Sequence, residues 1–181
     1  MADWGQVARR IRVPLGFVFA VLYIWLAKPT VKFFLVGLVI TIPGIWLRAL
    51  ASGHVRKNEA LTTSGPYAYT RNPLYLGSLI IAIGFLVAAC SLWIAFVMVI
   101  FFFAIYVPVI RGEETYLRSR FPEFEKYTRE VPRLLPRLNS SNSEKGSFSW
   151  ELYKKHREYN AILGALAVSA ILLIKMFWLK N

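Results

Sequence analysis

Residues 74–110 read LYLGSLIIAIGFLVAACSLWIAFVMVIFFFAIYVPVI, and none of them is charged. An α-helix needs about 20 apolar residues to cross the hydrocarbon core of a bilayer. We therefore place two helices in this stretch, at about Leu74–Cys90 and Leu92–Ile110. Only a residue or two near Ser91 is left to join them. The sequence predicts a tight antiparallel hairpin of two membrane-spanning helices.

Three further apolar runs lie outside this hairpin, at about Val13–Ala27, Thr30–Leu47 and Asn160–Trp178. The first two are short between charged residues, so the flanking Lys and Arg side chains must extend toward the interfaces. No small-x-small cleavage pattern follows the first run, which we expect to be a retained helix. The predicted fold is all-α, a polytopic membrane protein with about five transmembrane helices.

The composition combines 56% hydrophobic residues with 22 Lys plus Arg and a net charge of +12. The basic residues lie in the connections between apolar runs, which favours a lipid bilayer with anionic headgroups as the partner over nucleic acid. The single cysteine, Cys90, excludes an intramolecular disulfide and a thiolate cluster, and we expect it to be buried at a helix end. We expect no metal site.

Most Lys and Arg residues lie in the N-terminus, in the connection between the second and third runs, and in residues 111–157. Positively charged connections stay on the cytosolic side of a membrane. The N-terminus and both connections are therefore predicted to be cytosolic, and the C-terminus is predicted to lie outside. No polar block is long enough for a separate soluble catalytic domain, so an active site must form from cytosolic helix ends and loops.

We divide the chain into three parts. Residues 1–138 form a membrane core of four spans with a cytosolic catalytic segment, the Ser/Asn-rich residues 139–149 form a flexible linker, and residues 150–181 carry the fifth span. Within the core, residues 114–130 place apolar side chains at helical spacing. They predict a helix that lies along the membrane surface or in solvent.

Residues 65–77, GPYAYTRNPLYLG, lead into the third apolar run. Asn72 followed by Pro73 predicts an N-cap and the first helical position, because Asn can cap free amides and proline has none to lose. The free amides of a helix start favour an anion, and Arg71 adds a positive charge there. Gly77 leaves room for a ligand or for a neighbouring helix. The alternative is that Arg71 and the tyrosines only anchor the helix at the headgroups and that Gly77 only serves packing.

Residues 106–115, YVPVIRGEET, end the fourth run at the same membrane face. Carboxylates at a helix carboxyl end oppose the macrodipole, so function explains Glu113 and Glu114 better than local stability does. One carboxylate can bind an ammonium group, and Arg111 can bind a substrate carboxylate in bidentate geometry. The alternative is a surface ion cluster of Arg111 with Arg118 and Arg120. An anion site, a cation site and aromatic rings suit several ligands, among them S-adenosylmethionine with its sulfonium.

These residues also resemble a known family. GPYAYTRNPLYLG is similar to the GPYxxxRHPxYxG motif of isoprenylcysteine carboxyl methyltransferases and related phospholipid methyltransferase-like membrane enzymes. Residues 111–138, RGEETYLRSRFPEFEKYTREVPRLLPRL, resemble their second signature, a glutamate pair followed by Phe, Tyr and V-P-R-x-x-P. The resemblance covers about residues 53–138 and implies S-adenosylmethionine as the cofactor, held at cytosolic helix ends without a Rossmann domain.

The resemblance also implies roles for individual residues. It implies a substrate-side catalytic role for Arg111, a catalytic role for Glu114 and a lid-like segment that includes Pro136. The cofactor-binding residues it implies are Tyr67, Arg71, Asn72, Pro73, Tyr75, Gly77, Glu113, Tyr127 and Arg133.

Asn72 departs from the family motif, which has histidine at this position. Asparagine can donate a hydrogen bond but cannot titrate, so no proton transfer is expected there. The leading hypothesis is O-methylation of a carboxylate on an amphiphilic, prenyl-like substrate in the membrane. The alternatives are N-methylation of a phospholipid amine, an NADPH-dependent reductase similar to sterol reductases, and a helical scaffold without catalytic activity.

Overall fold

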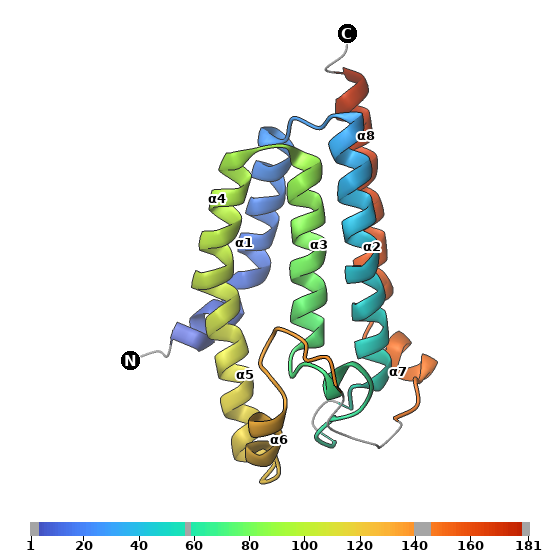
Figure 1. Cartoon of the computed structure of the whole chain (residues 1–181). Helices are drawn as coiled ribbons and strands as arrows, with labels where there is room; N and C mark the ends of the chain where they lie inside the picture. The colour runs from blue at the N-terminus through green and yellow to red at the C-terminus, as the bar shows by residue number, and fades with distance from the viewer. Residues whose placement is uncertain (1–3, 57–58, 140–145, 179–181) are drawn as a thin grey trace.

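The computed structural model describes residues 4–56, 59–139 and 146–178, and this described part contains helices but no strand. Its long helices stand side by side in Figure 1. They are α1 (Trp4–Leu26), α2 (Val31–His54), α3 (Pro73–Ala89), the continuous helix formed by α4 (Leu92–Phe101), the π-helical η2 (Phe102–Tyr106) and α5 (Val107–Arg120), and α8 (Tyr159–Trp178). The short helices η1 (Gly65–Ala68), α6 (Phe124–Glu130) and α7 (Trp150–Lys155) lie at the lower end of the bundle in Figure 1, which we call the site end.

Three helices of the described part are long and apolar enough to cross a membrane. They are α2, the continuous helix Leu92–Arg120, and α8, and α3 is a shorter apolar helix of 17 residues. The predicted class, an all-helical integral membrane protein, is confirmed. The count of five spans and the cytosolic orientation stay predictions.

Several boundaries differ from the predicted ones. Helix α1 begins at Trp4 rather than near Val13, and α2 continues past Leu47 to His54. Arginine is a good helix former, so the basic residues extend these helices instead of ending them. Cys90 does end α3, in a left-handed conformation with φ of 50°, but it is exposed rather than buried.

The helix predicted over residues 114–130 is interrupted. Helix α5 ends at Arg120 and α6 begins at Phe124. Phe121 is extended, with φ of −127° and ψ of 108°, because it precedes Pro122 and the proline ring disfavours the helical conformation there. The break lets α6 turn back, so that Phe124, Tyr127 and Val131 form a small core with Leu61, Leu117 and Phe121.

Helices α2 and α3 pack against each other through two glycine pairs. A Cβ atom at Gly77 would lie 2.8 Å from the Gly44 carbonyl oxygen, and one at Gly84 would lie 2.6 Å from the Gly37 carbonyl oxygen. Such distances are shorter than van der Waals contact. Small residues let helix backbones approach closely in membranes, and here they set the distance between α2 and α3.

Pro108 explains a contact between α1 and the α4–α5 helix. It has no backbone N–H to donate to the carbonyl oxygen of Ala104 four residues earlier. The indole Nε1 of Trp4 donates to that oxygen instead, at 3.0 Å. The turn that carries Ala104 is the π-helical η2, and π-helical turns are wider than α-helical ones. Helix α1 is therefore attached to the bundle at the irregular part of the α4–α5 helix.

The C-terminal helix is bound to the core at both ends. Near its start, Glu158 forms a bidentate ion pair with Arg48 of α2, with Nη2–Oε2 and Nη2–Oε1 distances of 2.8 and 2.9 Å. Near its end, Lys175 Nζ donates to the Trp25 carbonyl at 2.8 Å. In the predicted linker, residues 140–145 lie outside the described residues, while Ser149 N donates to Gly53 O at 2.9 Å.

The glycine contacts predict a selective effect of added methyl groups. Gly84→Ala should destabilise the protein by about 1–3 kcal/mol because α2 and α3 must separate. Gly164→Ala on α8 is the matched control, since a Cβ there meets nothing within 4 Å. Its effect should be neutral or stabilising by up to about 1 kcal/mol. Thermal unfolding in detergent, followed by circular dichroism, measures both. Equal melting temperatures for the two variants would contradict this account of the α2–α3 contact.

Candidate active site

The carboxylate of Glu114 on α5 is the centre of the site end. Its residue is only 7% exposed. Arg133 reaches it with Nε and Nη2 at 2.9 and 2.8 Å from Oε2, and Asn72 donates to Oε1 from Nδ2 at 3.2 Å. Arg71 Nε lies 3.6 Å from the same Oε1 atom. Two separate segments, one with Arg71 and Asn72 and one with Arg133, therefore converge on the buried negative charge of α5.

The convergence depends on backbone pairing between the loop before α3 and residues 132–137. Arg71 N donates to Pro132 O at 2.9 Å, and Arg137 N donates to Tyr69 O at 3.1 Å. Thr70, which is 1% exposed, donates from its hydroxyl to Leu134 O at 3.0 Å. These bonds hold Arg71 and Arg133 beside each other on neighbouring segments.

Asn72 occupies the predicted N-cap position, and Pro73 is the first residue of α3. The predicted side-chain cap is wrong, because the Asn72 side chain makes no cap hydrogen bond to the helix. Its amide Nδ2 instead donates to the Glu114 carboxylate and to Arg133 O, the latter at 2.9 Å. A hydrogen bond to a charged acceptor is strong, and together these two bonds fix an orientation of the amide in which its oxygen does not cap the helix.

The site has more positive charge than Glu114 balances. Arg71 Nε is buried without a hydrogen-bond partner in the described part of the chain, and so is Nη2 of Arg137. The side chain of Arg71 is 11% exposed. Buried donors without partners are rare and costly, so the arrangement suits an additional anionic group.

Two buried tyrosines lie near these charged groups. The hydroxyl of Tyr127 donates to the Tyr67 carbonyl at 2.7 Å, and both residues are buried. Burial, followed by the proximity of Tyr127 and Glu113, raises the pKa of Tyr67. Burial also raises the pKa of Tyr127, although Arg71 and Arg137 act in the opposite direction. Both phenols stay neutral at physiological pH and serve as donors or aromatic surfaces rather than as bases.

A second polar contact joins the start of α3 to α5. The Tyr75 hydroxyl donates to Glu113 Oε1 at 2.8 Å, and Arg12 Nη1 of α1 donates to that hydroxyl at 3.4 Å. Asn72 with Glu114 and Tyr75 with Glu113 therefore make two adjacent connections between α3 and α5. Nothing in the sequence indicated that Arg12 belongs here, because the N-terminal arginines predicted only the orientation of the chain in the membrane.

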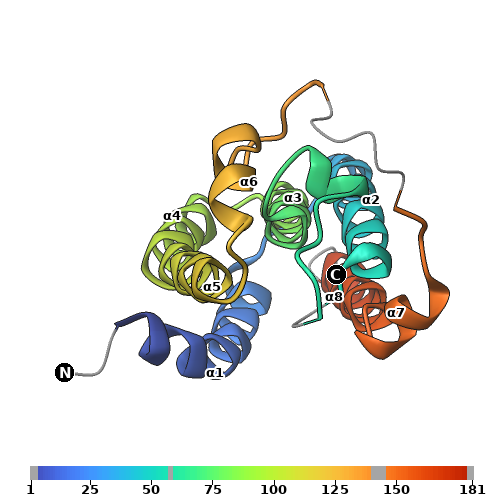
Figure 2. The ribbon, with the colours of Figure 1, turned by 90° about the horizontal axis from the view of Figure 1, so that it is seen from below.

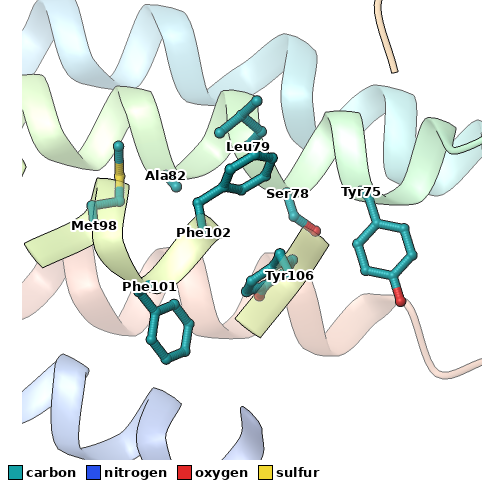
Figure 3. Close-up of a pocket in the computed structure, with 8 residues that line it drawn as sticks. All are labelled: Tyr75, Ser78, Leu79, Ala82, Met98, Phe101, Phe102 and Tyr106. Carbon is teal, nitrogen blue, oxygen red and sulfur yellow. The ribbon is translucent and has the colours of Figure 1, made fainter. Parts of the chain in front are cut away.

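A pocket opens between α3 and the α4–η2 segment, beside Tyr75 (Figure 3). Its cavity volume is about 80 Å³. In Figure 3, Phe102 points toward Leu79, and Tyr106 lies opposite Ser78. The lining residues are Tyr75, Ser78, Leu79, Ala82, Met98, Phe101, Phe102 and Tyr106. We call this pocket the aromatic groove.

Two of the predicted site residues lie apart from these contacts. Arg111 is exposed on α5 and does not line the aromatic groove. Gly77 is buried against Gly44 and Arg48 of α2, so the close approach there is by a helix. Residues that the sequence analysis did not single out include Thr70 and Arg137, whose contacts are described above, and Arg12. Thr70 and Arg137 lie inside the two signatures, but only their partners across the fold distinguish them.

These features define a helical membrane protein with a buried polar site at one end of its bundle. The chain matches the family described as phospholipid methyltransferase over residues 30–123, and it belongs to that family. The match includes Asn72, Tyr75, Glu113 and Glu114, but it ends before Arg133 and begins after Arg12.

Two curated proteins are similar to this chain. The cobalt-zinc-cadmium resistance protein CzcN of Cupriavidus metallidurans is 39% identical over 104 residues, which is 58% of this chain and 47% of that protein. The nickel-cobalt-cadmium resistance protein NccN of Alcaligenes xylosoxydans xylosoxydans is 32% identical over 121 residues, which is 66% of this chain and 56% of that protein. The chain thus spans about half the length of the curated relatives it matches. No solved structure matches.

Among the described residues, no group of three or more His, Cys, Asp or Glu side chains is placed to hold a metal ion.

The two glutamate–arginine contacts of α5 predict different stabilities. Glu114→Ala should cost about 3–5 kcal/mol, because it leaves buried cations without their carboxylate. Glu125→Ala is the control. It removes a carboxylate that pairs with Arg118 at 3.0 Å, but both side chains are more than half exposed. Its cost should be at most about 1 kcal/mol. Denaturant or thermal unfolding in detergent compares them, and equal losses would show that Glu114 does not hold the site end together.

Proposed function

We propose that this protein is an S-adenosylmethionine-dependent methyltransferase that acts on an amphiphilic substrate in the membrane. Membership of the phospholipid methyltransferase family supports the reaction class. The observation that carries the cofactor assignment is the buried Nε of Arg71, which has no hydrogen-bond partner although it lies beside Glu114. It marks a place for an anionic group at the start of α3.

The residues of the site fit the methionine end of S-adenosylmethionine. The carboxylate of that end suits Arg71, with Arg137 as a second nearby donor. Its ammonium group suits Glu114, and the sulfonium suits a tyrosine face. When bound, the cofactor supplies a methyl group attached to a positively charged sulfur. Asn72 and Arg133 contribute by holding the Glu114 carboxylate in a single orientation.

The acceptor in our leading proposal is a carboxylate, which is nucleophilic at neutral pH and needs alignment and desolvation rather than a base. The rival acceptor is the amine of a phospholipid headgroup. A neutral amine must lose a proton after methyl transfer, and Glu113 Oε1, which already accepts a hydrogen bond from Tyr75, is the group that can take it. Asn72 takes no proton in either case. The positive charge of the connections supports a site that faces the cytosol.

The same excess of positive charge also suits the phosphate groups of NADPH. Cofactor binding therefore tests the proposal directly. Calorimetry on the purified protein should show binding of S-adenosylhomocysteine, and binding of NADPH alone would contradict the methyltransferase assignment. Transfer of a labelled methyl group to a prenylcysteine carboxylate or to phosphatidylethanolamine then distinguishes the acceptors.

Arg71→Lys should weaken the binding of S-adenosylhomocysteine about tenfold or more, because lysine keeps the charge but loses the planar donor pair. Arg118→Lys is the matched control, since its side chain is 60% exposed and pairs with Glu125 away from the site. It should bind S-adenosylhomocysteine as the wild type does. If both variants retain wild-type affinity, Arg71 does not contact the cofactor.

A further inference from the structure

Arg48 of α2 contacts α3 and the turn before α8 at the same time. Its Nε and Nη2 atoms bind the Glu158 carboxylate, with an Nε–Oε2 distance of 3.1 Å and an Nη2–Oε1 distance of 2.9 Å. Its Nη1 atom donates to the Leu74 carbonyl at 3.2 Å and to the Ser78 hydroxyl, both in the first two turns of α3. Gly77 permits this approach, because a Cβ atom there would lie 2.6 Å from Cγ of Arg48. One guanidinium therefore connects α2, α3 and the turn before α8.

The start of α3 is held from two sides. Seen from below, α3 lies between α2 and α5 (Figure 2). On the α5 side, Asn72 donates to Glu114 and Tyr75 donates to Glu113. On the α2 side, Arg48 donates to α3 within the same two turns. Because the side chains of a helix turn together, a rotation of α3 that broke the contacts with Arg48 would also move Asn72 and Tyr75 relative to the two carboxylates.

The ion pair of Arg48 with Glu158 also acts on a tyrosine of the candidate active site. Burial is the largest cause of the raised pKa of Tyr67. Glu158 raises this pKa further, whereas Arg48 lowers it. Charges that are shielded from water act on their neighbours more strongly than exposed ones do. The pair therefore belongs to the electrostatic surroundings of the site, although Glu158 lies far from it in sequence.

The turn that presents Glu158 has an uncommon backbone conformation. Arg157 has φ of 53°, in the left-handed region that residues other than glycine seldom occupy. The side chain of Glu158 is only 12% exposed and that of Arg48 only 23%, so both charges give up much of their contact with water. A buried ion pair often stabilises a protein no more than apolar residues would. The attachment of α8 alone therefore does not account for this arrangement, and strained backbone of this kind is found where geometry serves a function.

We propose that Arg48 and Glu158 are positioning residues, which set the rotation of α3 and so keep the proposed S-adenosylmethionine site in the conformation that binds. Glu158 orients the guanidinium, and the guanidinium holds the first two turns of α3. The inference rests on the proposed function and assigns part of its site to the C-terminal segment. Glu158 lies outside residues 30–123, over which the chain matches its family.

The first test compares two ion pairs of the C-terminal segment, in the full chain in lipid nanodiscs. Glu158→Gln should weaken the binding of S-adenosylhomocysteine, measured by calorimetry, about fivefold or more, because Arg48 loses its charged partner. It should also raise the hydrogen exchange rate of the amides in residues 74–80 about fivefold or more. Lys155→Gln is the matched control, since the pair of Lys155 with Glu59 also joins this segment to the loop after α2, but both side chains are more than half exposed. It should change neither quantity. Wild-type affinity or wild-type exchange in Glu158→Gln would overturn the proposal.

The second test separates the positioning of α3 from the attachment of α8. Arg48→Glu combined with Glu158→Arg reverses the ion pair but removes the donor to Leu74 and Ser78. The melting temperature should recover from its value in Glu158→Gln toward that of the wild type. The affinity for S-adenosylhomocysteine and the exchange at the start of α3 should not recover. Recovery of all three would show that the pair only attaches α8.

Ser78→Ala tests the same point without altering either charge. It keeps the ion pair and removes one acceptor of Arg48 on α3, so it should weaken the binding of S-adenosylhomocysteine about threefold with little change in melting temperature. Unchanged affinity and unchanged exchange at the start of α3 would contradict the positioning role.

Hydrogen exchange keeps this proposal separate from the proposed function. If the wild type does not bind S-adenosylhomocysteine, the methyltransferase assignment fails, and the exchange of α3 in Glu158→Gln and in the reversed pair still decides whether Arg48 positions the helix. If the wild type and Glu158→Gln bind it equally well, the assignment stands and the positioning role fails.

Discussion

The buried negative charge of Glu114 needs cations and hydrogen-bond donors around it, and the chain supplies them from two places. Arg133 comes from the segment after α6, and Arg71 and Asn72 come from the loop before α3. A charge removed from water is tolerated only when such partners are present. The site end therefore assembles around one carboxylate, and the backbone pairing of residues 69–71 with 132–137 holds those partners beside it.

The distances between the helices come from small residues and from one proline. The glycine pairs bring α3 close to α2, which leaves the opposite side of α3 to face α5 and the aromatic groove. Pro108 removes a donor from the α4–α5 helix, and Trp4 of α1 compensates for it. This contact holds α1 against the α4–α5 helix, and Arg12 of α1 donates to the Tyr75 hydroxyl there. Seen from below in Figure 2, α1 and α5 lie next to each other, while α8 lies on the α2 side of α3.

Where the sequence analysis succeeded, the signal was local. The apolar runs, the proline at the start of α3 and the two signatures all concern residues close together in the chain. It failed for the Asn72 side chain, because the Glu114 carboxylate that accepts from its Nδ2 and orients it lies 42 residues away in sequence. It also missed the break at Phe121, although Pro122 was a visible local signal for it. Arg12 had no local signal at all.

The sequence by itself determined that this is a helical membrane protein of the phospholipid methyltransferase family, because helix length, hydropathy and motif spacing are properties of contiguous residues. Only the tertiary structure decided which charged groups share a site. Glu113 and Glu114 are neighbours in the chain, yet one pairs with Tyr75 and the other with Asn72, Arg71 and Arg133. Successive residues of a helix point in directions about 100° apart, so each carboxylate meets a different set of partners. Which partners are present depends on how the helices pack, and no single segment of the sequence determines that packing.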